Sequence, residues 1–253
     1  MGTACRAWIV MAVVFGVLWP TAAVAGRAEE LVRQADQLQG APTPSDASLQ
    51  RAIALYEEAA TLEPNAAEIH VKLADAALTM GAWTTGDRLR WYGRGRQAAE
   101  RAVALDKDNP EAWFLLAANI GQMAALQKDL GGLLVPRELE RHLSRVLAVN
   151  PRHARALHMM GMLLRKTPGP LRVSLKGNAS ETEKYLIAAT EADPNFSEAR
   201  LDLAQYYVSE GRLPQARAQA QAIVKMTSPT RPRAWREKHR PAAEALLKQL
   251  PAE

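Results

Sequence analysis

Arginine and aromatic side chains gather in one short stretch and form the most distinctive polar group of the sequence. The cluster consists of Arg88, Arg90, Trp91, Arg94, Arg96 and Arg101. Because guanidinium groups present planar sets of N–H donors, such a cluster suits a carboxylate-bearing ligand or an acidic partner. The plainer interpretation is the solvated face of a helix. Both interpretations stay open here, with Arg94 and Arg96 as the candidate anion-binding residues.

Histidine and carboxylate residues do not show the spacings that metal binding or catalysis requires. The five histidines are His70, His142, His153, His158 and His239. No two of them lie four residues apart on a helix, and the one cysteine, Cys5, is far from all of them. Adjacent carboxylates such as Glu57 and Glu58 fit polar helix faces, because a catalytic acid needs a desolvating pocket. We therefore expect no catalytic residue, no metal site and no cofactor.

The N-terminal residues have the pattern of a secretory signal. Arg6 precedes an apolar run, Ala7–Leu18, which is shorter than the roughly 20 residues of a membrane span. Pro20 is expected to break a helix, and Ala23-Val24-Ala25 offers small residues for cleavage after Ala25. The prediction is a signal peptide at 1–25, a mature domain at 26–253 and a periplasmic or secreted location, with no membrane span after cleavage. An uncleaved membrane anchor is the alternative.

Charge and composition narrow the class of partner. The chain carries 32 basic and 27 acidic residues. This balance is too mild to indicate nucleic-acid binding, and export argues against it further.

The hydrophobic set makes up 48% of the residues but aromatic residues only 6%, so the core must consist of small and aliphatic side chains. Such a core suits closely packed helices.

The stretch from Ser197 to Met226 reads as a pair of amphipathic helices. One helix face carries Leu203, Ala204 and Tyr207. The other carries Ala216, Ala220 and Ile223 at helical spacing. Gly211 is placed to end the first helix, as a glycine just past a helix commonly does.

The same pattern recurs along the chain. Helix openings are predicted at Ala67, Pro110, Ala154 and Ser197, with spacings of 43, 44 and 43 residues, each after a turn rich in Asn, Asp and Pro. The repeats predict an all-α right-handed solenoid of about five helix-turn-helix units. The predicted units span about 27–64, 67–109, 110–151, 154–194 and 197–228, and a C-terminal helix at 233–250 caps the stack.

The period exceeds that of a 34-residue repeat, and the extra residues are expected in long loops inside the units. Those loops are predicted at Met80–Arg88, Leu126–Pro136 and Lys166–Ser180. Gly161 fills the small position of the fourth unit, where its first helix meets its second. We expect a leucine to be tolerated less well there than at Gly131, which lies in a predicted loop.

The unit from Ser197 to Met226 closely resembles a tetratricopeptide repeat (TPR). The phrase from Trp91 to Ala102 also resembles the TRAP-transporter T-component family, which implies a periplasmic accessory of an uptake system. The phrases Leu157–Gly161 and Ala192–Phe196 resemble the regulator-of-microtubule-dynamics family. Both families are divergent helical-repeat proteins.

In TPR-like stacks the first helix of each unit lines a concave groove. This resemblance places side chains such as Glu68 and Val71 in the groove. The candidate groove residues are Asp75, Phe114, Gln122, His158, Met162, Arg165 and Gln205.

The resulting hypothesis is a non-catalytic, exported scaffold that binds a protein or peptide partner in its concave groove. The alternative is a periplasmic accessory of a TRAP-type uptake system that binds a small organic ligand and works with a membrane transport complex. Both assign the groove to binding and neither requires a cofactor.

Overall fold

The computed structural model describes residues 18–41, 44–127, 134–168, 175 and 179–251, and this part of the chain is helical without a β-strand. Its helices run in pairs along the chain. They are α1 (Leu18–Gln39), α2 (Asp46–Leu62), α3 (Ala67–Trp83), α4 (Arg88–Leu105), α5 (Pro110–Gln127), α6 (Leu134–Val149), α7 (Ala154–Lys166), α9 (Ala179–Ala192), α10 (Ser197–Ser209), α11 (Leu213–Val224), α12 (Pro232–Ala234) and α13 (Arg240–Gln249). A π-helical turn, η1 (Trp235–His239), joins α12 to α13. The prediction of an all-α solenoid is confirmed.

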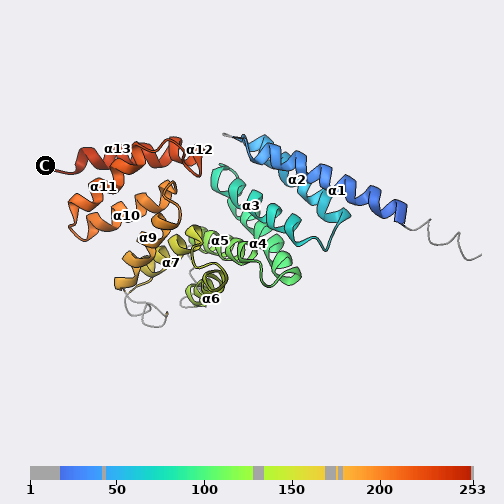
Figure 1. The fold of residues 1–253 in the computed structure, drawn as a ribbon, viewed down its shortest axis with the longest axis horizontal. Coiled ribbons are helices and arrows are strands. Elements are labelled where there is room, and N and C mark those ends of the chain that lie inside the picture. Colours follow the sequence, from blue (N-terminus) through green and yellow to red (C-terminus); the bar gives the residue numbers. More distant parts are fainter. Residues whose placement is uncertain (1–17, 42–43, 128–133, 169–174, 176–178, 252–253) are drawn as a thin grey trace, which may run out of the picture.

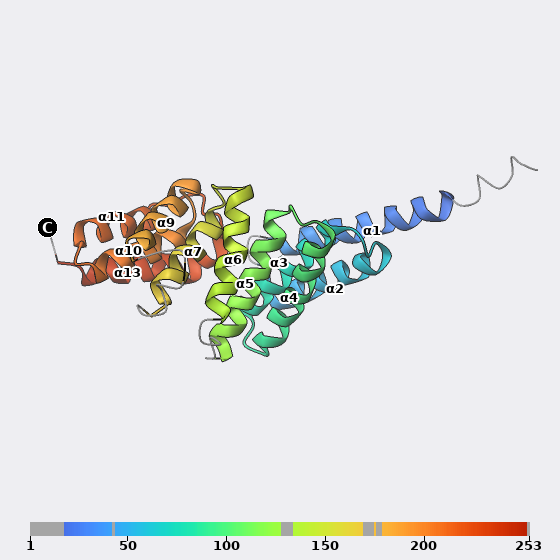
Figure 2. The same ribbon diagram turned by 90° about the horizontal axis from the view of Figure 1, so that it is seen from below.

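The stack of helix pairs curves into an arc. Figure 1 shows α5, α6 and α7 along the outside of the bend, with α1 and α2 at one end. The last helices lie on the other side of the arc, with α12 toward α1 to α3 and α13 running from α12 away to the C-terminus. Seen from below, the pairs follow one another along the long axis (Figure 2). This curvature gives the molecule a concave face on the side toward α12.

The residues that open the helices are those that the turns predict. Ala67, Pro110, Ala154 and Ser197 are the first residues of α3, α5, α7 and α10. Polar side chains satisfy free backbone N–H groups at several starts; for example, Ser45 accepts from Ser48 N before α2. Gly211 follows α10 with a φ of 70°, a conformation that favours glycine.

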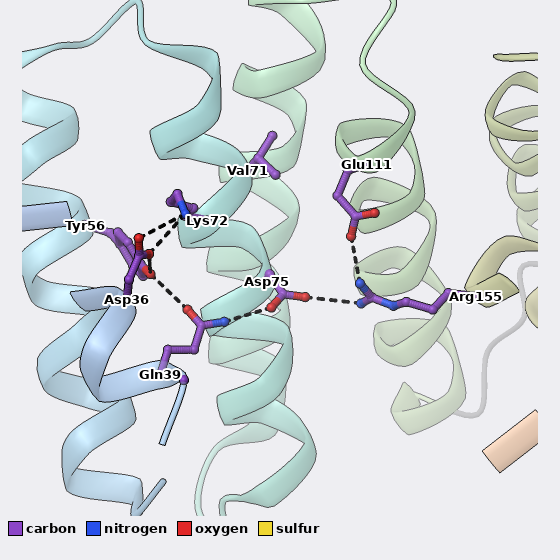
Figure 3. A pocket seen from close by; sticks show the side chains of 9 residues that line it. Asp36, Gln39, Tyr56, Val71, Lys72, Asp75, Glu111 and Arg155 are labelled. Carbon is purple, nitrogen blue, oxygen red and sulfur yellow. Dashed lines mark hydrogen bonds and ion pairs between the residues drawn. The ribbon is translucent and has the colours of Figure 1, made fainter. Parts of the chain in front are cut away.

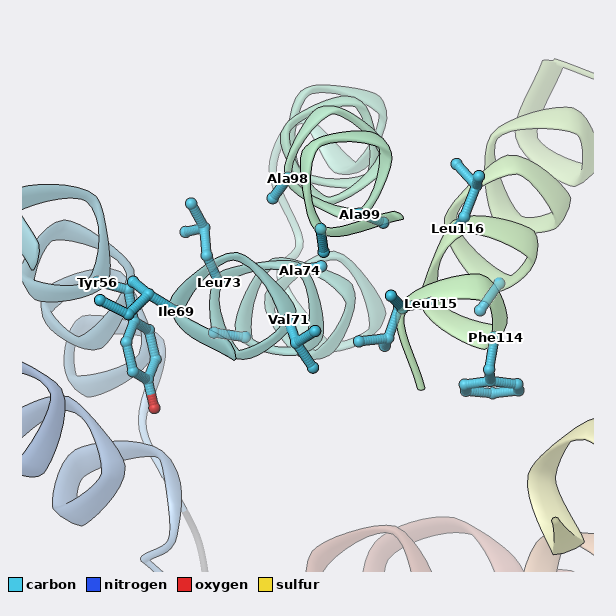
Figure 4. Packing of buried hydrophobic residues seen from close by; sticks show 14 of the residues in the cluster. Tyr56, Ile69, Val71, Leu73, Ala74, Ala98, Ala99, Phe114, Leu115 and Leu116 are labelled. Atoms are coloured by element: carbon cyan, nitrogen blue, oxygen red, sulfur yellow. The ribbon is translucent and has the colours of Figure 1, made fainter. Parts of the chain in front are cut away.

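Small side chains allow the helices of the first units to approach closely. Ala74 on α3 and Ala99 on α4 are fully buried and face each other across the pair (Figure 4). Gly81 on α3 lies against the buried ring of Tyr92 on α4, where a Cβ would meet the Tyr92 Cε1 at 2.5 Å. Gly95, likewise inside a helix, packs against Asn119. These contacts need alanine and glycine because interiors are close-packed.

Two local expectations are wrong. The loop predicted at Met80–Arg88 is much shorter, because α3 continues to Trp83 and α4 starts at Arg88. The extra residues of this unit therefore lengthen its helices. Pro20 does not break the helix but lies within α1. The other two predicted loops lie largely outside the described residues.

Candidate functional site on the concave face

A pocket of about 440 Å³ opens on the concave face between the first four units. Side chains from α1, α2, α3, α5 and α7 line it, so five helices converge on one site (Figure 3). The lining residues are Asp36, Gln39, Gly40, Tyr56, Val71, Lys72, Asp75, Glu111 and Arg155. Apart from Gly40 and Val71, every one of these residues has a polar side-chain group.

One part of the pocket centres on Asp36 of α1. The Tyr56 hydroxyl donates to Asp36 Oδ1 at 2.6 Å and lies 3.1 Å from Gln39 Oε1. Lys72 Nζ, from α3, donates to the same carboxylate at 3.1 Å. Burial of the Tyr56 ring, together with its bond to Asp36, raises the pKa of Tyr56 above its ordinary value. The hydroxyl therefore stays protonated and acts as a donor that joins α2 to α1.

The other part of the pocket is a chain of polar contacts across four units. Gln39 Nε2 donates to Asp75 Oδ2 at 2.8 Å, and the Arg155 guanidinium contacts Asp75 Oδ1 at 3.2 Å. The same guanidinium donates to Glu111 Oε1 at 2.7 Å. Asp75 is thus a groove residue that the sequence analysis names, and its two partners come from helices 36 and 80 residues away.

Glu111 is held as a carboxylate by its neighbours. Burial of the side chain raises its pKa, but the hydrogen bond from His153 and the charge of Arg155 outweigh burial and lower the pKa of Glu111 below its usual value. The His153 Nε2 lies 3.0 Å from Glu111 Oε2. A cation facing the pocket therefore meets a charged carboxylate across the neutral pH range.

Two pocket residues that the sequence analysis missed, Glu111 and Arg155, share one position of the repeat. Glu68, Glu111, Arg155 and Glu198 are each the second residue of the first helix of a unit. Glu68 was assigned to the groove, but its three equivalents were not. Repeating that position in every unit is the sequence signal that finds Glu111 and Arg155. Asp36, Gln39 and Tyr56 carry no such signal, because the first unit has a different spacing.

Three other predicted groove residues form contacts near the fourth unit. Phe114 is buried, and the Arg155 guanidinium lies over its ring at 4.2 Å. His158 Nε2 lies 2.6 Å from Asp202 Oδ2 of α10, so it joins two units. Arg165 donates to the Asp202 backbone oxygen at 3.4 Å. None of the three lines the pocket of the first four units.

The remaining predicted site residues lie elsewhere. Met162 packs against the cluster around Leu186, while Gln122 and Gln205 are exposed to solvent. Arg94 is hydrogen-bonded to Glu57 and lies over the Trp91 ring at 4.9 Å. Arg96 pairs with Glu100 of its own helix at 2.8 Å. The two arginines are outside the pocket, and each already has a carboxylate partner.

In the part of the chain that the structure describes, three or more His, Cys, Asp or Glu side chains do not come together in a way that would hold a metal ion. None of the helices described is long and apolar enough to cross a membrane.

The fold resembles several solved structures of low sequence identity. A thermophilic TPR protein of Thermus thermophilus has a TM-score of 0.61 and 20% identity over 85% of this chain and 98% of that chain. PilF of Pseudomonas aeruginosa has a TM-score of 0.55 and 15% identity over 90% and 91%. MamA has a TM-score of 0.50 and 15% identity over 78% and 89%. Together they show a TPR-like fold.

Sequence comparison assigns both halves of the chain to helical-repeat families. A tetratricopeptide-repeat model matches residues 175–236. No curated protein sequence matches the chain. The model described as "Regulator of microtubule dynamics protein 1-3" matches residues 31–166, which is more than half of the chain and includes every lining residue of the pocket. The chain therefore belongs to the regulator of microtubule dynamics protein 1-3 family.

Proposed function

We propose that this TPR-fold scaffold is exported and acts without catalysis, by binding a protein or peptide partner in its concave groove. The observation that carries the proposal is the convergence of polar side chains from five helices on one pocket of about 440 Å³. Such side chains offer both donors and acceptors to an extended backbone. Flexible polar side chains would lose conformational entropy on binding a partner. The side chains of this pocket are already fixed by contacts with one another, so this entropic cost is smaller.

A second pocket extends the surface along the first unit. It measures about 340 Å³ and shares Asp36 with the first pocket. Glu63 and Glu68 line it together with the apolar Val32 and Ile69. Two neighbouring pockets with a shared wall suit successive side chains of one peptide better than a single compact ligand.

The charge of the first pocket argues against a small organic acid. Its wall holds three carboxylates, Asp36, Asp75 and Glu111, against the two cations Lys72 and Arg155. A carboxylate ligand would face net repulsion, which disfavours the uptake-accessory alternative. A microtubule role requires a cytosolic protein, and the predicted export signal disagrees with that location. The chain therefore shares the fold of the family, and we do not propose for it the role in microtubule dynamics that the family's description names.

Site-specific crosslinking tests the binding face. A photo-reactive amino acid at Glu68, which is exposed and lines the second pocket, is expected to capture a partner in the native cell. The matched control is the same group at Gln97, which is exposed on α4. Equal capture from both positions, or capture from Gln97 alone, would overturn a groove-binding function. A thermal-shift screen with small organic acids tests the competing ligand class, and stabilisation by one of them would favour it.

Export is tested separately. The small residues Ala23 and Ala25 behind a short apolar run support cleavage before Gly26. N-terminal sequencing of the protein from the cell envelope is expected to begin at Gly26. A retained Met1 would refute the cleavage.

A further inference from the structure

The segment Thr230–Lys238, which we name the closing segment, connects the two ends of the arc. At one end Thr230 N donates to Asn195 O at 3.1 Å, and the Thr230 hydroxyl donates to Asp193 Oδ2 at 2.6 Å. These acceptors lie in the turn between α9 and α10. The start of the closing segment is therefore attached to the last units.

The other end of the closing segment reaches the first two units. Arg233 donates to the Pro44 backbone oxygen at 2.7 Å, a contact between residues 189 positions apart. The Arg233 guanidinium also lies 4.0 Å from the centre of the Trp83 ring, and Lys238 Nζ lies 3.9 Å from the same centre. Trp83, the last residue of α3, thus contacts two cations of the closing segment.

Between these anchors, Arg231 lies close to the charged residues of the concave groove and is exposed to solvent. Desolvation by neighbouring atoms lowers the pKa of Arg231. The charge of Arg155 lowers this pKa further, while Glu198, Asp75 and Glu111 raise it. In Figure 4 the pale red C-terminal ribbon lies across from the face that carries Val71 and Phe114. The charges that act on Arg231 therefore come from α3, α5, α7 and α10 together.

The closing segment and the groove have complementary charges. Carboxylates on the groove side, namely Asp36, Asp75, Glu111, Glu198 and Asp202, outnumber the cations Lys72, Arg155 and Arg165. The closing segment brings Arg231, Arg233 and Lys238 to that face, and its sequence, Thr-Arg-Pro-Arg, begins outside a helix. The closing segment is therefore basic, non-helical at Thr230 and Arg231 and helical from Pro232 onward.

We propose that the closing segment is an internal occupant of the concave groove, and that the groove takes from its partner a peptide segment carrying arginine, which displaces this segment. The inference rests on the proposed function for the existence of a partner and adds the chemistry of that partner. It follows from the contacts at Asn195, Pro44 and Trp83, which place a basic segment of this chain over the acidic groove. The partner must compete with a tethered ligand, so its apparent affinity depends on how often the segment is released.

Peptide binding to the full chain tests this inference. The probe is a fluorescent peptide with the sequence of residues 230–238. The variant is Arg233→Ala, which removes the contacts of Arg233 with Pro44 and Trp83 and leaves that of Lys238 with Trp83. Because the internal segment is then released more often, the variant is expected to bind the peptide about tenfold more tightly than the unaltered chain. The matched control is Arg236→Ala, an exposed arginine of η1, which is expected to bind as the unaltered chain does.

A second peptide tests the chemistry of recognition. It carries glutamate in place of both Arg231 and Arg233, and it is expected to bind none of the three proteins. Equal affinity of the unaltered chain and Arg233→Ala for the basic peptide would overturn the internal occupancy. Binding of the glutamate peptide as tightly as the basic one would overturn the preference for arginine.

Hydrogen exchange separates this inference from the proposed function. Arg233→Ala is expected to raise the exchange of amides 231–238 beyond that in Arg236→Ala, and unchanged exchange would refute the closure. If crosslinking at Glu68 captures no partner while the basic peptide binds Arg233→Ala, the proposed function fails and the internal occupancy stands. If a partner is captured but basic peptides bind neither protein, the proposed function stands and this inference fails.

Discussion

The two parts of the solenoid are stabilised in different ways. From α1 to the middle of α7, buried apolar side chains form one continuous core that runs from Ala28 to Met160. From α7 to α13 they divide into three smaller clusters, which include Leu157, Leu203 and Ile223 respectively. Between those clusters lie polar contacts, such as the 2.8 Å bond of Ser197 Oγ with His239 Nδ1.

This difference in the continuity of the core determines which part of the molecule is expected to unfold first. In a stack of repeats, each unit is stabilised by its nearest neighbours, and a break in the core weakens the coupling between them. The N-terminal part is expected to unfold as one cooperative unit, while the last helices open at a lower free energy. The closing segment is attached to the less continuous part, so its release need not disturb the pocket of α1 to α7.

The largest effect is expected from Gly81→Leu in the N-terminal part. A Cβ at Gly81 would lie 2.5 Å from the Tyr92 ring, which is fully buried and cannot move aside easily. Overpacking is expected to lower the free energy of unfolding by about 3 kcal/mol. Urea denaturation of the variant measures this loss, which should affect the whole transition of α1 to α6.

Gly93→Leu is the matched control for Gly81→Leu. Gly93 lies on α4 of the same helix pair, but a Cβ there meets nothing within 4 Å. Leucine also improves helix propensity, by up to about 1 kcal/mol. Gly93→Leu should therefore be neutral or slightly stabilising. If Gly93→Leu lost as much stability as Gly81→Leu, the close approach of α3 and α4 would not be the reason why residue 81 must be small.

A smaller effect is expected from Gly161→Leu on α7, where the two parts meet. A Cβ there lies 3.0 Å from Leu186 Cδ2 and 3.3 Å from the Thr182 backbone oxygen. We expect a loss of about 1–3 kcal/mol, confined to α7 through α13, so that denaturation splits into two steps. A single shifted transition would mean that the two parts are not separable. The comparison variant Gly131→Leu falls outside the described residues, and its milder effect stays a prediction.

The smallest effect is expected from acidification. Burial lowers the pKa of His239 below its ordinary 6.5; Glu198 and Asp202 of α10 raise it, whereas Lys238 and Arg231 lower it. Because the folded pKa lies below the unfolded one, docking of α13 is fully stable above pH 6.5 and weakens as the pH falls toward the folded pKa.

Hydrogen exchange measures this pH effect locally. Amides of α13 should lose protection below pH 6.5, after correction for the intrinsic exchange rate, while those of α3 should not. His239→Gln is the control, because it removes the titrating ring and should abolish the pH dependence of α13. A dependence that survives in His239→Gln would assign it to another group.

The sequence predicts the repeat far better than it predicts the site. Helix openings such as Pro110 and Ser197 follow from local signals, namely a turn and then an amphipathic stretch, so they are found without tertiary knowledge. Asp75 was placed in the groove by the same register. Its partners Gln39 and Arg155 depend on how strongly the stack curves, which no local pattern encodes. The loop expected at Met80–Arg88 was wrong because residues rich in turn signals there continue α3 instead.

The contacts of the closing segment, which join residues far apart in the sequence, are likewise not predicted by local sequence patterns. Arg233 and Pro44 lie in stretches that read as breakers, and nothing in their spacing indicates a contact. Only the superhelical curvature of the whole stack brings them together. The repeat pattern therefore predicts the helices that form the groove, but it does not predict that the closing segment lies over the groove.

The contact of Arg233 with Pro44 also has a mechanical consequence. An open solenoid stretches like a spring, because each unit touches only its neighbours. Here the two ends of the arc are fastened to each other, so residues 45 to 232 form a loop that a pull on the termini bypasses. Tension would pass from α1 through this junction into α13 and leave the repeats between them unloaded. Under force, the molecule is thus expected to stay short until the junction breaks, and only then to extend.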